Sequence, residues 1–165
     1  MATTSSIPFT TRTSLARPIV LGGMFIFLSQ CIHQWIVITL IQGSPYILVW
    51  QYIASGLLGD AAFEGGIATA LLGLFIHLII SFVIAGVFIL AADRIPLLRR
   101  YAIAGSLLYG FDVFVVLNMI VTPLSAAPQL PAPTRPWLIE DILEHILLVG
   151  LPLGILVRRN ANTSI

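Results

Sequence analysis

The chain alternates between long apolar runs and short polar segments. Four runs hold about 20 mainly apolar residues each, which is the length that a helix needs to cross a hydrocarbon layer about 30 Å thick. We therefore expect an all-α fold, an integral membrane four-helix bundle that forms one domain over residues 1–165. The expected spans are residues 18–41, 67–91, 101–121 and 136–157.

The composition agrees with a chain that lies mostly in lipid. Of its residues 58% are hydrophobic and only 9% are charged, whereas about a quarter of the residues in a soluble domain carry charge. The chain has no lysine and a net charge of +1, so we expect no nucleic-acid partner. Its single cysteine, Cys31, excludes an intramolecular disulfide and a zinc cluster built of cysteines.

The arginines predict how the chain is oriented. Seven of the eight would lie on one side of the membrane, and the positive-inside rule assigns that side to the cytoplasm. We therefore expect both termini, including a polar tail of residues 1–17, on the cytoplasmic face of a bacterial inner (plasma) membrane, with only Arg135 on the outer side. The seven are Arg12, Arg17, Arg94, Arg99, Arg100, Arg158 and Arg159.

Two longer connections would lie on the outer side. The first, GSPYILVWQYIASGLLGDAAFEGG, predicts a short interfacial helix with Ser44 as its N-cap and Pro45 at its first position. The rings of Tyr46, Trp50 and Tyr52 would anchor it in the headgroup layer, although the segment could instead cover a site between the helices. The second, TPLSAAPQLPAPTRP, is rich in proline and predicts an extended linker.

Each expected span brings one ionisable residue to a similar depth. Polar residues are costly in lipid and normally face the bundle interior, so these positions are the main functional candidates. We expect His77 to pair with Asp112, either to fix helix packing or to relay protons. The layer contains His33, His77, Asp112 and His145, accompanied by Gln30, Gln34, Ser81 and Asn118.

On the second span, small and polar residues recur every three or four positions. Such a stripe allows close approach of a neighbouring helix and should face inward. Its members are Gly66, Ala70, Gly73, His77 and Ser81.

The start of the fourth span is acidic. Glu140 and Asp141 complement the positive end of the helix dipole, whereas Glu144 and His145 lie deeper. Carboxylates on adjacent turns repel each other unless Arg135, a cation or a proton neutralises one of them. The segment predicts either a proton-accepting vestibule or a solvated helix start.

Three histidines at matched depth also allow a haem b site, because neutral imidazole is a common ligand of haem iron. His33, His77 and His145 would then be its ligands. Their spacing matches no known motif, so we expect no resident cofactor and no metal site. Phosphate-binding and hydrolase motifs are also missing, so we expect no enzymatic activity.

The order of features from residue 77 to residue 159 resembles the YagU-like family of uncharacterised bacterial inner-membrane proteins. The resemblance consists of a histidine-containing span, HLIISFVIAGVFILA, a basic turn, a span ending in NMIVTPL, a proline-rich loop, and EDILEH followed by RR. It implies a multi-pass inner-membrane protein and assigns no chemistry to any residue.

We therefore expect a small non-enzymatic accessory or structural protein that associates with itself or with a larger membrane complex. Faces with small residues would form the partner surfaces, namely those containing Ala85, Gly86, Gly105 and Gly110. A first alternative is a protein that conducts or senses protons or a small solute, with Glu144 and His145 as outer acceptors and His77 with Asp112 as the relay. A second alternative is a haem-based electron carrier.

Overall fold

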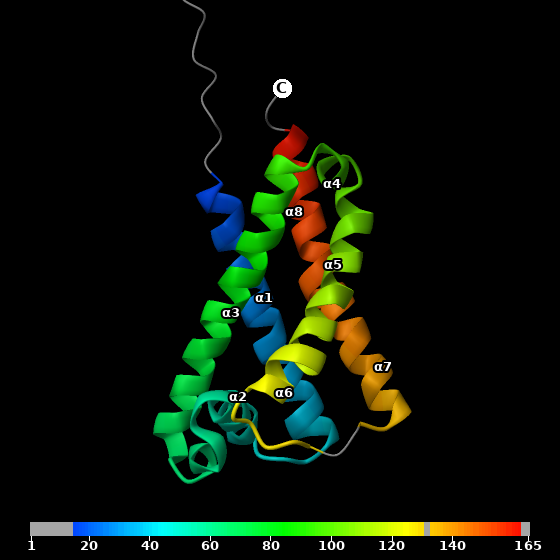
Figure 1. Cartoon of the computed structure of the whole chain (residues 1–165). Helices are drawn as coiled ribbons and strands as arrows, with labels where there is room; N and C mark the ends of the chain where they lie inside the picture. Colours follow the sequence, from blue (N-terminus) through cyan, green and yellow to red (C-terminus); the bar gives the residue numbers. More distant parts are fainter. Residues whose placement is uncertain (1–14, 131–132, 163–165) are drawn as a thin grey trace, which may run out of the picture.

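A computed structural model describes residues 15–130 and 133–162, and every regular element within those ranges is helical (Figure 1). Three long helical segments are long and apolar enough to cross a membrane: Ala16–Ile41, Gly66–Arg94 and Ala102–Leu124. They agree closely with the first three expected spans, so the expectation of an all-α fold with helices long and apolar enough to cross a membrane is confirmed. Most of the expected N-terminal tail, residues 1–14, lies outside the described ranges.

The first two segments are α1 (Ala16–Gln34), which continues into the π-helical η1 (Trp35–Ile41), and the uninterrupted α3 (Gly66–Arg94). The third consists of α5 (Ala102–Val116), the π-helical η3 (Leu117–Val121) and α6 (Thr122–Leu124). A short helix, α4 (Pro96–Arg100), links the second segment to the third.

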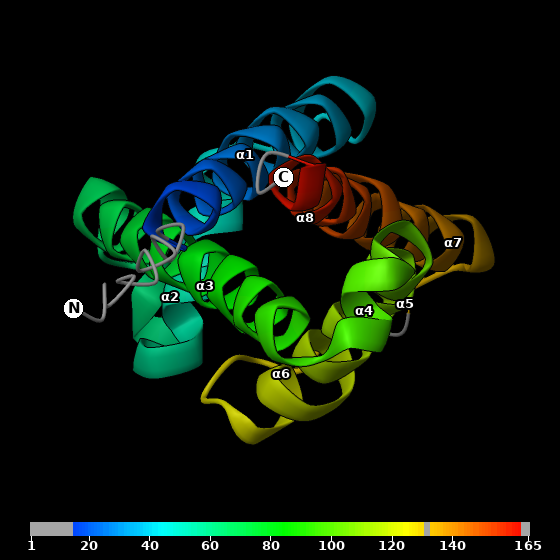
Figure 2. The ribbon, with the colours of Figure 1, turned by 90° about the horizontal axis from the view of Figure 1, so that it is seen from above.

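A fourth long segment is built from α7 (Arg135–Glu144), the π-helical η4 (His145–Gly150) and α8 (Leu151–Asn162). It packs beside the other three (Figure 2). Acidic residues in its first half and two arginines near its end make it more polar than the other segments. Its crossing of the membrane therefore stays a prediction.

The first described turn of α1 and the last turn of α8 lie at the same end of the molecule (Figure 1). At the opposite end lie α2 (Ile47–Leu58), its continuation η2 (Gly59–Phe63), and the start of α7. We call this opposite end the α2 end. The long segments enclose an apolar core near the middle and the terminal end, centred on Ile26, Phe88, Val149 and Leu153.

Small residues bring α5 and the fourth segment into direct backbone contact. A Cβ atom on Gly110 would lie 2.9 Å from Ile146 Cα, and one on Gly150 would clash with the backbone oxygen of Ser106. The expectation that Gly110 and Ala85 form surfaces for a partner is therefore wrong, because both pack inside this chain. A Cβ atom on Gly105 would meet only the Leu98 side chain, and Gly86 has open space around it.

The stripe on α3 faces inward as expected at Ala70, Gly73 and Ser81, all of which are buried. A Cβ atom on Gly73 would clash with the backbone oxygen of Trp50, so α2 lies directly on this stripe. Only Gly66, at the exposed start of α3, departs from the pattern. Its φ of +58° is one that glycine adopts without strain.

The connection before α3 differs from the expected interfacial helix. The helix begins at Ile47 without a side-chain cap, so the assignment of Ser44 as N-cap is wrong. Trp50 is only 6% exposed and packs inward, and so it does not anchor the segment at the membrane surface. The Tyr46 hydroxyl donates a 2.7 Å hydrogen bond to the Cys31 carbonyl. Burial raises the pKa of Tyr46 to about 12, which keeps this donor protonated.

The proline-rich connection lacks regular structure where it is described after Leu124, as expected. It is nevertheless attached to α2, because the Ala126 amide donates a 3.0 Å hydrogen bond to the Gly56 carbonyl. Residues 131–132 of this linker lie outside the described ranges.

Candidate functional site

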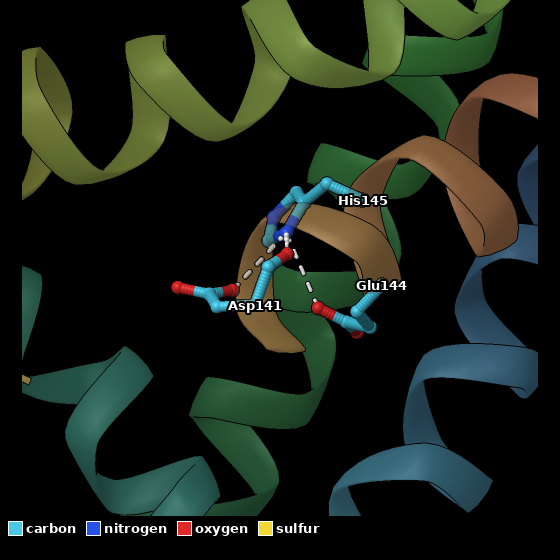
Figure 3. A group of neighbouring side chains, drawn as sticks. All are labelled: Asp141, Glu144 and His145. Carbon is cyan, nitrogen blue, oxygen red and sulfur yellow. Dashed lines mark hydrogen bonds and ion pairs between the residues drawn. The ribbon is translucent and has the colours of Figure 1, made fainter. Parts of the chain in front are cut away.

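Five ionisable side chains gather where α1 meets the fourth segment. His33 lies one residue before the end of α1, Glu140, Asp141 and Glu144 lie on α7, and His145 is the first residue of η4. We call these five residues the acid–histidine cluster. Figure 3 shows three of its members, Asp141, Glu144 and His145, turned toward one another.

Glu144 is the centre of this cluster. Its side chain is only 2% exposed, and each of its carboxylate oxygens meets a different imidazole. Oε1 lies 3.3 Å from His33 Nδ1, and Oε2 lies 3.2 Å from His145 Nδ1. A buried carboxylate is stable only when it is paired or protonated, so the two histidines are what allow Glu144 to be ionised here.

His33 lies between two carboxylates. Its second nitrogen, Nε2, is 2.7 Å from Glu140 Oε1. These contacts are as short as ion pairs but are not aligned as hydrogen bonds, since His33 Nδ1, Glu140 Oε1 and Glu144 Oε1 are buried without a hydrogen-bond partner. The attraction on this side of the cluster is therefore mainly electrostatic, and it depends on the charge of His33.

His145 has a better-defined arrangement. Its Nδ1 lies 2.8 Å from the Asp141 carbonyl oxygen and 3.1 Å from Asp141 Oδ1, in addition to its contact with Glu144. A carbonyl oxygen can only accept, so Nδ1 must carry a hydrogen in this arrangement. The ring is thereby fixed to its own helix turn.

Asp141, Glu144 and His145 each bring one possible ligand atom to within 4.8 Å of the others. The His145 atom that faces the two carboxylates is Nδ1, which already donates to the Asp141 carbonyl. A metal bound there would have to replace that hydrogen.

The charge of the cluster depends strongly on protonation. With both imidazoles protonated, two positive charges face three carboxylates. With both neutral, three negative charges lie close together around a buried centre. Among the described residues, the charged partners of these carboxylates are His33 and His145, and Arg135 is not one of them.

Three of the four long segments become π-helical close to this region. η1 begins two residues after His33, η3 contains Asn118, and η4 begins at His145. π-helical turns are rare and occur frequently at functional sites, because they shift side chains out of the regular helical register. Their grouping beside the ionisable residues supports a functional interpretation of this region.

His77 does not form the expected pair with Asp112. Its ring lies between Phe27 and Trp50, with centroid distances of 5.6 Å to each, and its Nε2 is buried without a hydrogen-bond partner. Asp112 is exposed on α5. The helix turns Tyr109 rather than Asp112 toward α3, where the hydroxyl donates to the Ile84 carbonyl at 2.9 Å.

A cavity of about 760 Å³ lies between the long segments at the α2 end. Its polar lining comes from six helical elements and includes Gln30, Gln34, Tyr52, His77, Ser81, Asn118, Glu140, Asp141 and His145. Most of the polar layer expected from the sequence therefore surrounds this space. Glu144 and His33 do not line the cavity, but His33 contacts Glu140 of the lining and Glu144 contacts His145 of the lining.

Sequence reasoning found Glu144 and His145 but missed that His33 lies between Glu140 and Glu144. The signal was present, because His33 and the acidic start of the fourth segment lie at similar distances from the same end of the bundle. Any two of the three histidines include His33 or His145, so a haem bound by two of them would require at least one imidazole to leave its carboxylate partners. A pair that includes His77 would also require that ring to leave Trp50. The haem alternative stays a prediction that an absorption spectrum can test.

No protein-family model matches the chain, and neither the curated proteins nor the solved structures contain a match to it. The resemblance to the YagU-like family stays a prediction.

Proposed function

We propose that this chain is a pH-responsive membrane protein whose acid–histidine cluster takes up and releases protons. The observation that carries the proposal is the position of Glu144, which is buried and meets His33 of α1 and His145 of the fourth segment at 3.3 and 3.2 Å. One carboxylate therefore joins two helical segments through two imidazoles, the side-chain type whose unperturbed pKa lies closest to neutral pH.

Loss of protons from the imidazoles would leave Glu140, Asp141 and Glu144 as neighbouring negative charges. Like charges in a poorly solvated site repel each other strongly, and the cheapest relief is separation of α1 from α7 or entry of a cation. Protonation would restore the attraction. The cluster thus couples proton binding to the packing of the cavity wall.

The direct test is thermal unfolding in neutral-lipid nanodiscs from mildly acidic to mildly alkaline pH. We expect the wild-type protein to lose stability as pH rises, because deprotonated histidines no longer balance the three carboxylates. Glu144→Gln should flatten this dependence. Glu64→Gln is the matched control, because Glu64 is exposed and lies outside the cluster.

An unchanged pH dependence in Glu144→Gln would contradict the proposal. A second assay separates binding from conduction. Sealed vesicles with an internal pH dye should show accelerated proton entry only if the cluster forms part of a conducting path, and Glu144→Gln should then slow that entry.

A second candidate function is the accessory role in a larger membrane assembly, and Asp112 favours it. This exposed carboxylate lies near the middle of Ala102–Leu124, a segment long enough to cross a membrane. A carboxylate that faces lipid is costly unless it is protonated or paired with a donor from another chain. A second copy of the chain or a different membrane protein could supply that donor.

Native mass determination after gentle solubilisation tests this role. We expect the wild-type protein to travel in a larger assembly, whose mass distinguishes a homo-oligomer from a complex with another protein. Asp112→Leu should release the single chain, whereas Asp112→Asn should retain part of the association through its amide. Equal masses for all three proteins would contradict the accessory role.

We further propose that the fourth segment also crosses the membrane and that both termini face the cytoplasm of a bacterial cell. The arginine distribution supports this orientation. The first described turn of α1 and the last turn of α8 lie at the same end of the molecule, which agrees with an even number of crossings.

A further inference from the structure

The lining of the cavity at the α2 end combines acidic, aromatic and aliphatic side chains. Its acidic members are Glu140 and Asp141, with side chains that are 33% and 35% exposed. Its lining contains no arginine, and the chain has no lysine. The fixed charge at the cavity wall is therefore negative whenever the nearby histidines are neutral.

Aromatic rings form another part of the wall. Trp50, Tyr52 and Trp137 line the cavity, and the His77 ring is 5.6 Å from that of Trp50. Aromatic faces attract cations, most strongly where water is excluded. The remaining lining consists largely of aliphatic side chains from α1, η1, α2 and α3, such as Ile26, Val37, Ile53 and Ile80.

The volume of about 760 Å³ falls within the range of small-molecule sites, which is about 300 to 1,000 Å³. It exceeds what a bare metal ion or a few waters require. An apolar wall with carboxylates at one side and aromatic rings at another matches a ligand that has a positively charged head and an apolar body.

We propose that this cavity binds an organic ammonium ion with an apolar body, in competition with protons of the acid–histidine cluster. The competition rests on the proposed function, whereas the binding itself does not. Protonated His33 and His145 offset part of the negative charge of Glu140, Asp141 and Glu144, and the positive charge of the ammonium ion offsets part of it when the imidazoles are neutral. His77, whose Nε2 is buried without a partner, is the remaining titratable group that faces the site from α3.

Two sources can present this chemistry. One is a soluble amphiphilic amine or quaternary ammonium compound, and the other is the ammonium headgroup of a membrane lipid. Both would place the charge near Glu140 and Asp141 and the apolar body against the aliphatic wall.

The experiment measures binding of benzyltrimethylammonium by tryptophan fluorescence in nanodiscs of a neutral glycolipid, which contains no ammonium group. A Trp35→Phe background removes the exposed tryptophan that lies outside the cavity lining and leaves Trp50 and Trp137 as reporters. Neopentylbenzene, the uncharged isostere, is titrated in parallel. We expect saturable binding of the cation and at least about tenfold weaker binding of the isostere.

Glu140→Gln and Asp141→Asn should each weaken binding of the cation about tenfold and leave binding of the isostere unchanged. Glu64→Gln is the matched control, because it removes an exposed carboxylate outside the cavity lining. The comparison of the two probes on the wild-type protein needs no variant, so it tests the site even where a substitution disturbs folding. Equal affinity for the two probes, or no binding of either, would overturn the inference.

Two further measurements, in a different lipid and at different pH values, identify the source of the ligand and test its competition with protons. Weaker cation binding in phosphatidylcholine than in glycolipid indicates that a lipid headgroup occupies the site, and equal binding indicates a soluble ligand. Binding that strengthens as pH rises supports competition with protons. Selective binding of the cation without pH dependence would keep the site and remove the proposed proton uptake.

Discussion

At the residue scale, the proposed proton uptake depends on one buried carboxylate. Glu144 is held by two histidines rather than by an arginine, and histidine is the side chain whose charge changes near neutral pH. Its side chain is 2% exposed, so it cannot substitute water for a lost partner. Under the proposed function, the protonation of His33 and His145 is a condition for the local packing.

A double-mutant cycle on His33 and Glu144 measures this coupling. We expect His33→Ala and Glu144→Ala each to lower the free energy of unfolding by about 2 to 4 kcal/mol, because each leaves a buried polar group without its partner. The double variant should be less destabilised than the sum, with a coupling of at least about 1 kcal/mol. Reversible unfolding in mixed micelles provides the measurement, and strict additivity would show that the pair does not interact.

Substitution of His77 should have the opposite effect on stability. Because its buried Nε2 has no partner, His77→Leu removes an unsatisfied polar atom, and we expect the stability to stay unchanged or to rise. His145→Leu is the comparison and should be destabilising, since it removes contacts with Asp141 and Glu144. A large loss of stability in His77→Leu, measured by the same unfolding assay, would show that this histidine holds the bundle together.

At the element scale, the position of the cluster depends on how closely α5 packs against the fourth segment. Gly110 and Gly150 allow the two backbones to touch beside His145, and Ser106 of α5 lies between Gly150 and Gly154. Small residues at helix contacts are the usual means of close packing in lipid. The orientation of His145 therefore depends on glycines that carry no chemistry of their own.

Gly150→Ala tests this dependence. Its Cβ would clash with the Ser106 backbone oxygen and lie 3.2 Å from Leu107 Cα, so η4 would have to move away from α5. We expect a loss of about 1 to 3 kcal/mol in the free energy of unfolding. Gly86→Ala is the control, because no atom lies within 4 Å of the added carbon and the helix propensity improves. Equal stability of the two variants would contradict the close contact.

Hydropathy was enough to predict the first three long segments to within a few residues, because length and apolarity are properties of the chain itself. It was not enough to predict how each helix is rotated. Asp112 was expected inside and lies outside, because Tyr109 and Gly110 decide which face of α5 packs. The π-helical turns that begin at Trp35, Leu117 and His145 also change the register, and no local pattern in the sequence predicts them.

The same limit explains the partial success at the site. Glu144 and His145 were predicted from neighbouring positions on one helix, which periodicity describes well. The partner from α1 depends on the distance between two segments that are far apart in the sequence. Trp50 was assigned to the membrane surface because aromatic residues are common there, but Gly73 leaves room for α2 to bury it.

At the scale of the whole molecule, the described ends of the chain lie together and the cavity lies at the opposite end. If the fourth segment crosses the membrane and both termini face the cytoplasm, as proposed, the cluster and its cavity belong to the outer half of the bilayer. The protein would then respond to the pH and solutes outside the cell rather than to those of the cytoplasm.

Tags at the two termini and in the α2 end test this arrangement. We expect tags before Ala16 and after Asn162 to resist protease in intact cells and a tag placed at Gly43 to be cleaved, because positive charges flank the terminal end. Cleavage of only one terminal tag would show an odd number of crossings and would remove the fourth span. A tag inserted at Asp93 is the control and should be protected.

The central claim is that one carboxylate links the protonation of two histidines. Nuclear magnetic resonance of protein labelled with ¹⁵N only at histidine tests it directly, because the chain contains three histidines. We predict that the signals of His33 and His145 change together during a pH titration and that Glu144→Gln alters both. Independent titration of these two rings, each unaffected by Glu144→Gln, would contradict the account.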